Sequence, residues 1–155
     1  MRILRIFIAP SHNYVGRHGM EPGSAPMLEV AEVECLPGRG LAGDRYLDHK
    51  PDYKGQITFF SQEAFEDLRE EFAVFDRDVD AFRRNVIVSG LDLRELVGRE
   101  FTIQGITFAG TEEAKPCYWM ERAFCTGAEA ALKGRGGLRA RILTQGILRA
   151  EEPQA

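Results

Sequence analysis

The sequence has few of the residues that mark disulfide-rich or zinc-binding proteins. Its 155 residues include only three cysteines, Cys35, Cys117 and Cys125, and no C-x-x-C spacing occurs. Three cysteines cannot all pair, so neither a disulfide framework nor a standard zinc site is expected. The three histidines are scattered and show no spacing typical of a metal triad. We therefore expect a cytoplasmic protein with free thiols.

Long apolar runs and an excess of positive charge are also missing. The apolar segment 3–9 is too short to span a bilayer and is interrupted by Arg5, so it predicts a first strand and no membrane anchor. The formal net charge is −4 and the isoelectric point is near 5.5. Binding to nucleic acid without sequence preference needs a basic surface, so neither a nucleic acid nor a membrane is expected as a partner.

What the chain does contain is sufficient for one globular domain. Hydrophobic residues make up 44% of the sequence and charged residues 28%, which is ordinary for a folded protein. A domain of this size buries roughly 70% of the surface of its unfolded chain. We expect a single domain over residues 1–150 and a short tail over residues 151–155.

The apolar pattern predicts a mostly β fold with a few short α-helices. Helices are expected after Ser61 and Asp92, over residues 116–124, and after a capping box formed by Thr126 and Glu129. Gly105 is expected to turn a hairpin. Strands are expected over residues 3–9, 28–36, 56–60, 85–89, 100–104, 106–111 and 138–144. About seven strands with short helices favour a closed or nearly closed β-barrel.

The tripeptide Lys115-Pro116-Cys117 is the first candidate site. Proline suits the first turn of a helix, so Pro116 predicts that a helix begins here and directs its positive end towards Cys117. A helix N-terminus and a neighbouring lysine both favour the thiolate, which is the reactive form of cysteine. The alternative is that Cys117 is a small apolar residue buried beside Tyr118 and Trp119.

Arginine beside glycine forms the second group of candidates. A guanidinium binds phosphate or carboxylate with two parallel hydrogen bonds, and glycine allows backbone N–H groups to approach the same anion. The alternative is that these arginines form surface ion pairs and that the glycines serve turns. The candidate segments are Gly43-Asp44-Arg45, Arg83-Arg84-Asn85, Arg135-Gly136-Gly137, and Arg139 with Arg141.

Taken in order, these motifs resemble the MOSC domain, which is named for the C-terminal domain of molybdenum cofactor sulfurases. The resemblance covers residues 1–150 and depends on the ordered set more than on any single motif. The matching motifs are Gly43-Asp44-Arg45, Phe82-Arg83-Arg84-Asn85, Gly90-Leu91-Asp92-Leu93, Lys115-Pro116-Cys117 and Gly134-Arg135-Gly136-Gly137-Leu138-Arg139-Ala140-Arg141, followed by Gly146-Ile147.

The resemblance implies a barrel-like β fold that binds the molybdenum cofactor, a molybdopterin. It implies that Cys117 is either a ligand of molybdenum or a carrier of sulfur. The phosphate of the cofactor would be bound by arginine forks and glycine N–H groups, and Lys115, also a candidate for binding the cofactor, would hold Cys117 ionised. The remaining candidates for binding the cofactor are Gly43, Arg45, Arg83, Asn85, Arg135, Gly136, Arg139 and Arg141. Larger family members carry a pyridoxal-phosphate-dependent domain that this sequence does not show, so the closer likeness is to small stand-alone bacterial MOSC proteins.

Three functions are compatible with these residues. The first is an oxidoreductase that reduces N-hydroxylated small molecules, with Cys117 as the molybdenum ligand and a separate reductase as the electron donor. The second is a carrier of sulfur or cofactor in which a cysteine desulfurase loads Cys117 with a persulfide. The third is a non-catalytic β-barrel binding module with a structural cysteine.

Overall fold

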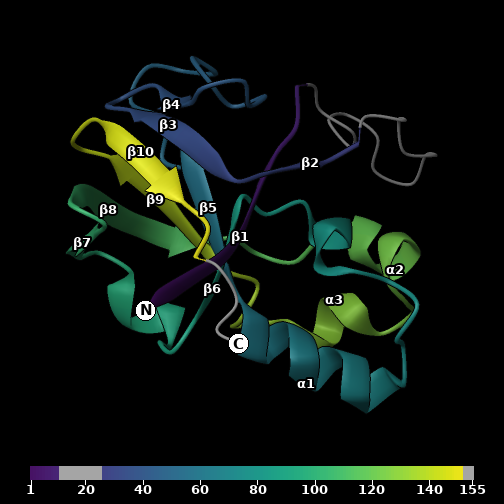
Figure 1. Ribbon diagram of the computed structural model, residues 1–155. Coiled ribbons are helices and arrows are strands. Elements are labelled where there is room, and N and C mark those ends of the chain that lie inside the picture. Colours follow the sequence, from purple (N-terminus) through teal and green to yellow (C-terminus); the bar gives the residue numbers. More distant parts are fainter. Residues whose placement is uncertain (11–25, 152–155) are drawn as a thin grey trace.

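A seven-stranded sheet forms the centre of the protein (Figure 1). The computed structural model describes residues 1–10 and 26–151, so the expected tail lies outside the described residues apart from Glu151. The strands follow the order β2-β1-β6-β5-β9-β8-β7, and only β5 and β6 are parallel neighbours. Their bounds are β1 (Arg2–Ile8), β2 (Leu28–Val30), β5 (Ile57–Ser61), β6 (Val86–Ser89), β7 (Glu100–Ile103), β8 (Ile106–Glu113) and β9 (Leu138–Ile142).

A second, three-stranded sheet has the order β10-β3-β4. Its strands are β3 (Glu32–Leu36), β4 (Gly40–Leu41) and β10 (Gly146–Arg149). In Figure 1 this sheet lies at the upper left, on the opposite side of the molecule from the helices. The prediction of a single strand over residues 28–36 is therefore wrong, because these residues form two strands. The chain leaves the large sheet at Ala31 and continues in the small one, so β2 and β3 belong to different sheets.

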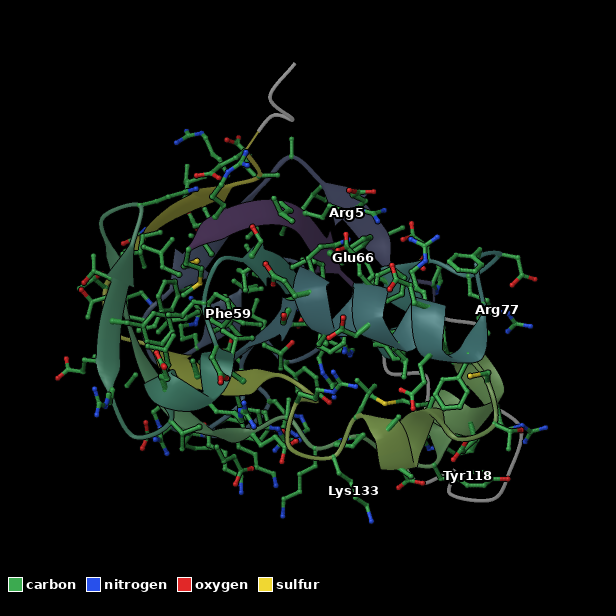
Figure 2. The ribbon with its side chains drawn as sticks, turned by 90° about the horizontal axis from the view of Figure 1, so that it is seen from below. Arg5, Phe59, Glu66, Arg77, Tyr118 and Lys133 are labelled. Atoms are coloured by element: carbon green, nitrogen blue, oxygen red, sulfur yellow. The ribbon has the colours of Figure 1, made fainter. Side chains whose placement is uncertain are left out.

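Both faces of the large sheet are buried, because successive side chains of a strand point to opposite faces. Ile6 and Phe59 face a core shared with the small sheet, which contributes Val33 and Leu148 among others. Figure 2 shows Phe59 inside this part of the molecule. The next residues along β1 and β5, Phe7 and Phe60, face a second core under the helices.

The helices gather against that second core. They are α1 (Gln62–Phe72), α2 (Trp119–Ala123) and α3 (Ala128–Ala131), with the 3-10 turn η1 (Val79–Phe82). A second 3-10 turn, η2 (Leu93–Leu96), packs against the first core. The cap expected at Ser61 is confirmed, because its hydroxyl accepts the N–H of Ala64 at 3.1 Å. Asp92 caps η2 in the same way through the N–H of Arg94. The longest helix has 11 residues, and none in the described part combines the length and apolarity of a membrane span.

The mostly β class is confirmed, but the sheet does not close into a barrel. Strand β7 ends the large sheet on one side, and β10 ends the small sheet. Where a closed barrel would have a backbone ladder, the side-chain amide of Gln104 takes its place. It donates to the carbonyl of Arg149 at 2.8 Å and accepts the N–H of Arg149 at 2.9 Å.

Two local predictions about turns have opposite outcomes. The hairpin about Gly105 is confirmed, with Gln104 and Gly105 both at positive φ (53° and 79°) between β7 and β8. The capping box of Thr126 and Glu129 is wrong. The N-cap of α3 is Gly127, at φ 96°, with no side-chain cap bond. The carboxylate of Glu121 accepts the N–H of Gly127 instead, so a side chain of the preceding helix, α2, bonds to the N-terminus of α3.

The helix expected to begin at Pro116 begins instead at Trp119, with Tyr118 at its N-cap. Cys117 therefore precedes the helix and does not lie in its first turn. The reason is the packing of the preceding segment: Pro116 lies against Gly136, where an added Cβ would come within 2.8 Å of the proline ring.

Candidate functional site

Cys117 lies in the segment between β8 and α2, and its side chain is exposed. Its carbonyl accepts the N–H of Met120 at 3.0 Å, so the backbone leads directly into α2. Trp119 and Met120 enter the core, whereas Tyr118 remains 37% exposed. Figure 2 shows Tyr118 on the outer side of the helical end. The alternative of a core cysteine therefore does not describe Cys117.

A small cavity of about 50 Å³ lies beside this segment. Five cationic side chains line it and no carboxylate does. The lining residues come from the turn after β4, the start of β5, the end of η1, the segment after β8 and strand β9. They are Arg45, Tyr46, Tyr53, Gly55, Thr58, Arg83, Arg84, Ala114, Lys115 and Arg139. We refer to this cavity as the cationic pocket.

Asp44 holds Arg45 at the pocket. The Asp44 carboxylate is buried and accepts the backbone N–H of Ala9 at 3.0 Å and Nη1 of Arg45 at 3.1 Å. Nη2 of Arg45 donates to the carbonyl of Arg83 at 3.0 Å, and the guanidinium lies 4.8 Å from the ring centre of Tyr46. Asp44 therefore orients the arginine and does not itself line the pocket.

Asn85 is buried and its side chain is fully engaged. Its Oδ1 accepts the N–H and the hydroxyl of Thr58, both at 3.0 Å. Its Nδ2 donates to the carbonyl of Phe7 at 3.1 Å and to Asp44 at 3.4 Å. Asn85 thus joins β1, β5 and the Asp44 turn under the pocket, and in this arrangement it does not face a ligand.

Arg139 is brought to the pocket by the register of β9. It lies opposite Thr58 on β5 and opposite Glu112 on β8. Its Nη1 lies 3.2 Å from the Glu112 carboxylate. Hydrogen bonding to Lys54 is the main cause of the lowered pKa of Glu112, and the charge of Arg139 adds to it.

Two other expected arginines lie elsewhere. Arg141 shares the outward face of β9 with Arg139, but it pairs with Asp52 at 2.9 Å and is not among the pocket residues. Arg135 lies 3.3 Å from Asp67 and lines a separate cavity of about 460 Å³ beside the first turn of α1. Of the expected anion-binding residues, those that line the cationic pocket are Arg45, Arg83, Lys115 and Arg139.

The expected glycines serve the backbone and do not line the pocket. Gly136 donates its N–H to Glu113 at 3.2 Å. A Cβ at Gly136 would lie 2.4 Å from the Ala114 carbonyl oxygen, so only glycine allows this close approach. Gly43 has φ 83° and makes the exposed turn before Asp44.

Sequence reasoning missed the role of Arg84, which lies within one of the motifs typical of the family. Its guanidinium donates to the carbonyls of Gly136 and Ala114, both at 2.9 Å. Burial is the main reason that the pKa of Arg84 is lowered to about 10. The nearby Cys117 raises this pKa and Arg139 lowers it further. The signal in the sequence is the motif Phe82-Arg83-Arg84-Asn85, but the motif does not show that Arg84 and Arg83 have different roles.

The pocket also has an aromatic wall that the sequence did not indicate. Tyr46 and Tyr53 stack with ring centres 5.5 Å apart, and His49 contacts both edge to face. Burial raises the pKa of Tyr53. Among the described residues, no group of three or more His, Cys, Asp and Glu side chains is arranged to hold a metal ion.

The chain belongs to the MOSC domain family, whose model matches residues 41–153. Among solved structures, the YuaD protein from Bacillus subtilis is similar with a TM-score of 0.72 and 17% identity, over 96% of this chain and 91% of that chain. YiiM from Escherichia coli is similar with a TM-score of 0.66 and 17% identity, over 97% of this chain and 67% of that chain. YiiM from Geobacillus stearothermophilus gives a TM-score of 0.65 at 16% identity, over 96% and 71%. At these identities the likeness shows the fold. No curated protein matches the sequence.

Proposed function

We propose that this protein binds the molybdenum cofactor, with the phosphate of the pterin in the cationic pocket and Cys117 as the protein ligand of the metal. One observation carries the proposal. Five cationic side chains converge on one cavity, and the segment that contributes Lys115 to it presents an exposed thiol two residues later. The family membership of residues 41–153 supports the same cofactor class.

The chemistry of these groups fits the cofactor. Guanidinium groups bind phosphate with paired hydrogen bonds, and a thiolate is a soft ligand suited to a metal that is also held by the sulfur atoms of the pterin. The cavity of about 50 Å³ has room for an oxyanion the size of phosphate and not for a ring system. The pterin ring would therefore remain outside the cavity, and Cys117 would supply one ligand.

The electrostatics of the pocket also favour an anion. Arg45 is matched by Asp44 and Arg139 by Glu112, whereas Arg84 forms no ion pair with a carboxylate among the described residues. Positive charge that is partly removed from water and not neutralised is stabilised by a bound anion.

When bound, the cofactor supplies a metal able to accept an oxygen atom. We infer an oxidoreductase that reduces N-hydroxylated small molecules and takes its electrons from a separate reductase. In this function Arg45, Arg139 and Lys115 bind the phosphate, and Cys117 fixes the metal. The exposure of Cys117 favours one alternative, a carrier whose persulfide is loaded by a cysteine desulfurase, because an accessible thiol is what such a partner requires.

The proposal is tested on protein made in cells that synthesise the cofactor. We expect molybdenum and pterin to purify together with the wild-type protein. Cys117→Ser should lose the metal without a change in thermal unfolding, because the thiol is exposed, and Arg139→Gln should lose the pterin. Arg149→Gln is the matched control, since Arg149 is an exposed arginine paired with Glu32 on β3.

The outcome also separates the two functions. Turnover of an N-hydroxylated amidine in a reductase-coupled assay would support the oxidoreductase. A persulfide on Cys117 in metal-free protein would support the carrier. If neither pterin nor molybdenum binds the wild-type protein, the proposal is wrong.

A further inference from the structure

Arg84 has an unusual environment for an arginine at the edge of a proposed binding site. Its guanidinium is surrounded by backbone carbonyl groups in place of carboxylates. It donates through Nε to Gly136 at 2.9 Å, through Nη1 to Phe82 at 3.3 Å, and through Nη2 to Ala114 at 2.9 Å and Lys115 at 3.4 Å. These bonds leave one N–H group, on Nη1, for another acceptor.

These carbonyls belong to three separate segments of the chain. Phe82 ends η1, Ala114 and Lys115 follow β8, and Gly136 precedes β9. The segments after β8 and before β9 are also joined by a backbone hydrogen bond, in which the N–H of Ala114 donates to the carbonyl of Gly137 at 2.9 Å. The Arg84 side chain ties both of them to the end of η1.

The bond to Lys115 brings this arrangement within two residues of Cys117. At the other end of the segment, the Cys117 carbonyl accepts the N–H of Met120 in α2 at 3.0 Å. The segment that carries the thiol is thus held at one end by Arg84 and at the other by the helix.

A charged donor bonded to carbonyl groups is worth more than a neutral one, and several bonds from one rigid planar group fix their acceptors relative to one another. Lysine offers the same charge from a single point and does not match this geometry. We propose that Arg84 is a positioning residue that holds the segment Ala114–Cys117 in place and so presents Cys117 at the edge of the cationic pocket.

This inference rests on the proposed function only in that Cys117 is the group to be presented. The test therefore contains no cofactor. In a Cys125→Ser background, a nitroxide spin label is attached to Cys117, the exposed cysteine; Cys35 is fully buried and burial raises its pKa to about 12. The electron paramagnetic resonance line shape reports the mobility of the label, and amide hydrogen exchange is measured on unlabelled protein.

Arg84→Gln is compared with Arg77→Gln. Arg77 is the matched control because it donates to one backbone carbonyl near this site, that of Ala123 at the end of α2, whereas Arg84 donates to four. For Arg84→Gln we expect the mobile fraction of the label to become dominant. Exchange of the amides of residues 114, 115, 117 and 118 should rise about tenfold or more, with exchange in β1 and β6 unchanged. For Arg77→Gln we expect less than about a twofold change in either measurement.

Two further variants keep the test decisive. Arg84→Lys preserves the charge, and we expect an intermediate mobility. It replaces Arg84→Gln if that variant does not fold. In Arg84→Gly, added methylguanidinium can take the place of the missing guanidinium and should restore the immobile line shape of the label. A general stabiliser such as glycerol should not restore it. Unchanged line shape and exchange in the Gln or Lys variant would overturn the inference. A uniform rise of exchange across the whole sheet would overturn it as well, because Arg84 would then stabilise the fold and not this segment.

Discussion

Replacing Asn85 by alanine should destabilise the protein strongly, although the residue lies beside a proposed binding site. Asn85 is 1% exposed, and its side chain accepts two hydrogen bonds from Thr58 and donates one to Phe7. Alanine would leave the N–H and the hydroxyl hydrogen of Thr58 without acceptors. The carbonyl of Phe7 would lose this donor. A ligand-binding asparagine with a side chain facing solvent would have no such effect.

The magnitude follows from the number of buried groups left unpaired. Each costs about 1–3 kcal/mol when it stays buried without a partner. Because the hydroxyl of Thr58 can rotate to another acceptor, we count the N–H of Thr58 and the carbonyl of Phe7 in full and expect a loss of about 3–5 kcal/mol. With a urea dependence of about 2 kcal/mol per molar, the unfolding midpoint should fall by roughly 2 M.

Equilibrium unfolding in urea measures this loss. The control is Gln62→Ala, which removes an exposed amide bonded to Glu66 on α1 and should cost less than about 0.5 kcal/mol. A loss below about 1 kcal/mol for Asn85→Ala would refute the reasoning. It would mean that the polar groups of Thr58 and Phe7 are satisfied without the Asn85 side chain.

Two further predictions concern the backbone near Cys117 and the surface charges. Gly136→Ala should cost about 3 kcal/mol in urea unfolding, because its Cβ would overlap the Ala114 carbonyl, whereas Gly134→Ala, with φ 84° and open space around it, should cost about 1 kcal/mol. Equal losses would contradict the close packing. Hydrogen bonds from Arg5 hold the pKa values of Glu29 and Asp78 below their usual range, so their stabilisation is present above about pH 4 and is lost as the pH falls through the folded-state values. Arg5→Gln should therefore be less stable than wild type by roughly 1 kcal/mol at neutral pH, and the difference should shrink towards zero at low pH; a difference that does not depend on pH would count against the ion pairs.

Much of the local structure could be predicted from neighbouring residues. The caps at Ser61 and Asp92 and the hairpin at Gly105 depend on groups only two to five residues apart, so the sequence pattern specifies them directly. Predictions failed where a distant contact intervened. The hydrogen bond between Gly127 and Glu121 replaces the capping box expected at Thr126. The helix expected at Pro116 begins later because Pro116 packs against Gly136.

The division of one expected strand into β2 and β3, and the open edge at β10, have the same kind of cause. Strand length and alternation predict that residues 28–36 are extended, but not which sheet each half joins. The amide of Gln104 closes the gap to Arg149 across 45 positions of sequence, and no local pattern indicates that contact.

The sequence by itself determined the family, because an ordered set of short motifs can be identified without any knowledge of contacts. It also identified Cys117 as a candidate functional residue. Only the tertiary structure decided which basic residues meet there. Arg139 and Arg141 are equivalent by alternation along β9, yet the register that pairs Arg139 with Thr58 brings only Arg139 to the pocket. Arg84 reaches Gly136 across 52 positions. Hydrogen bonds and charge interactions act over a few ångströms, so the chain must fold before residues this far apart in sequence can form one site.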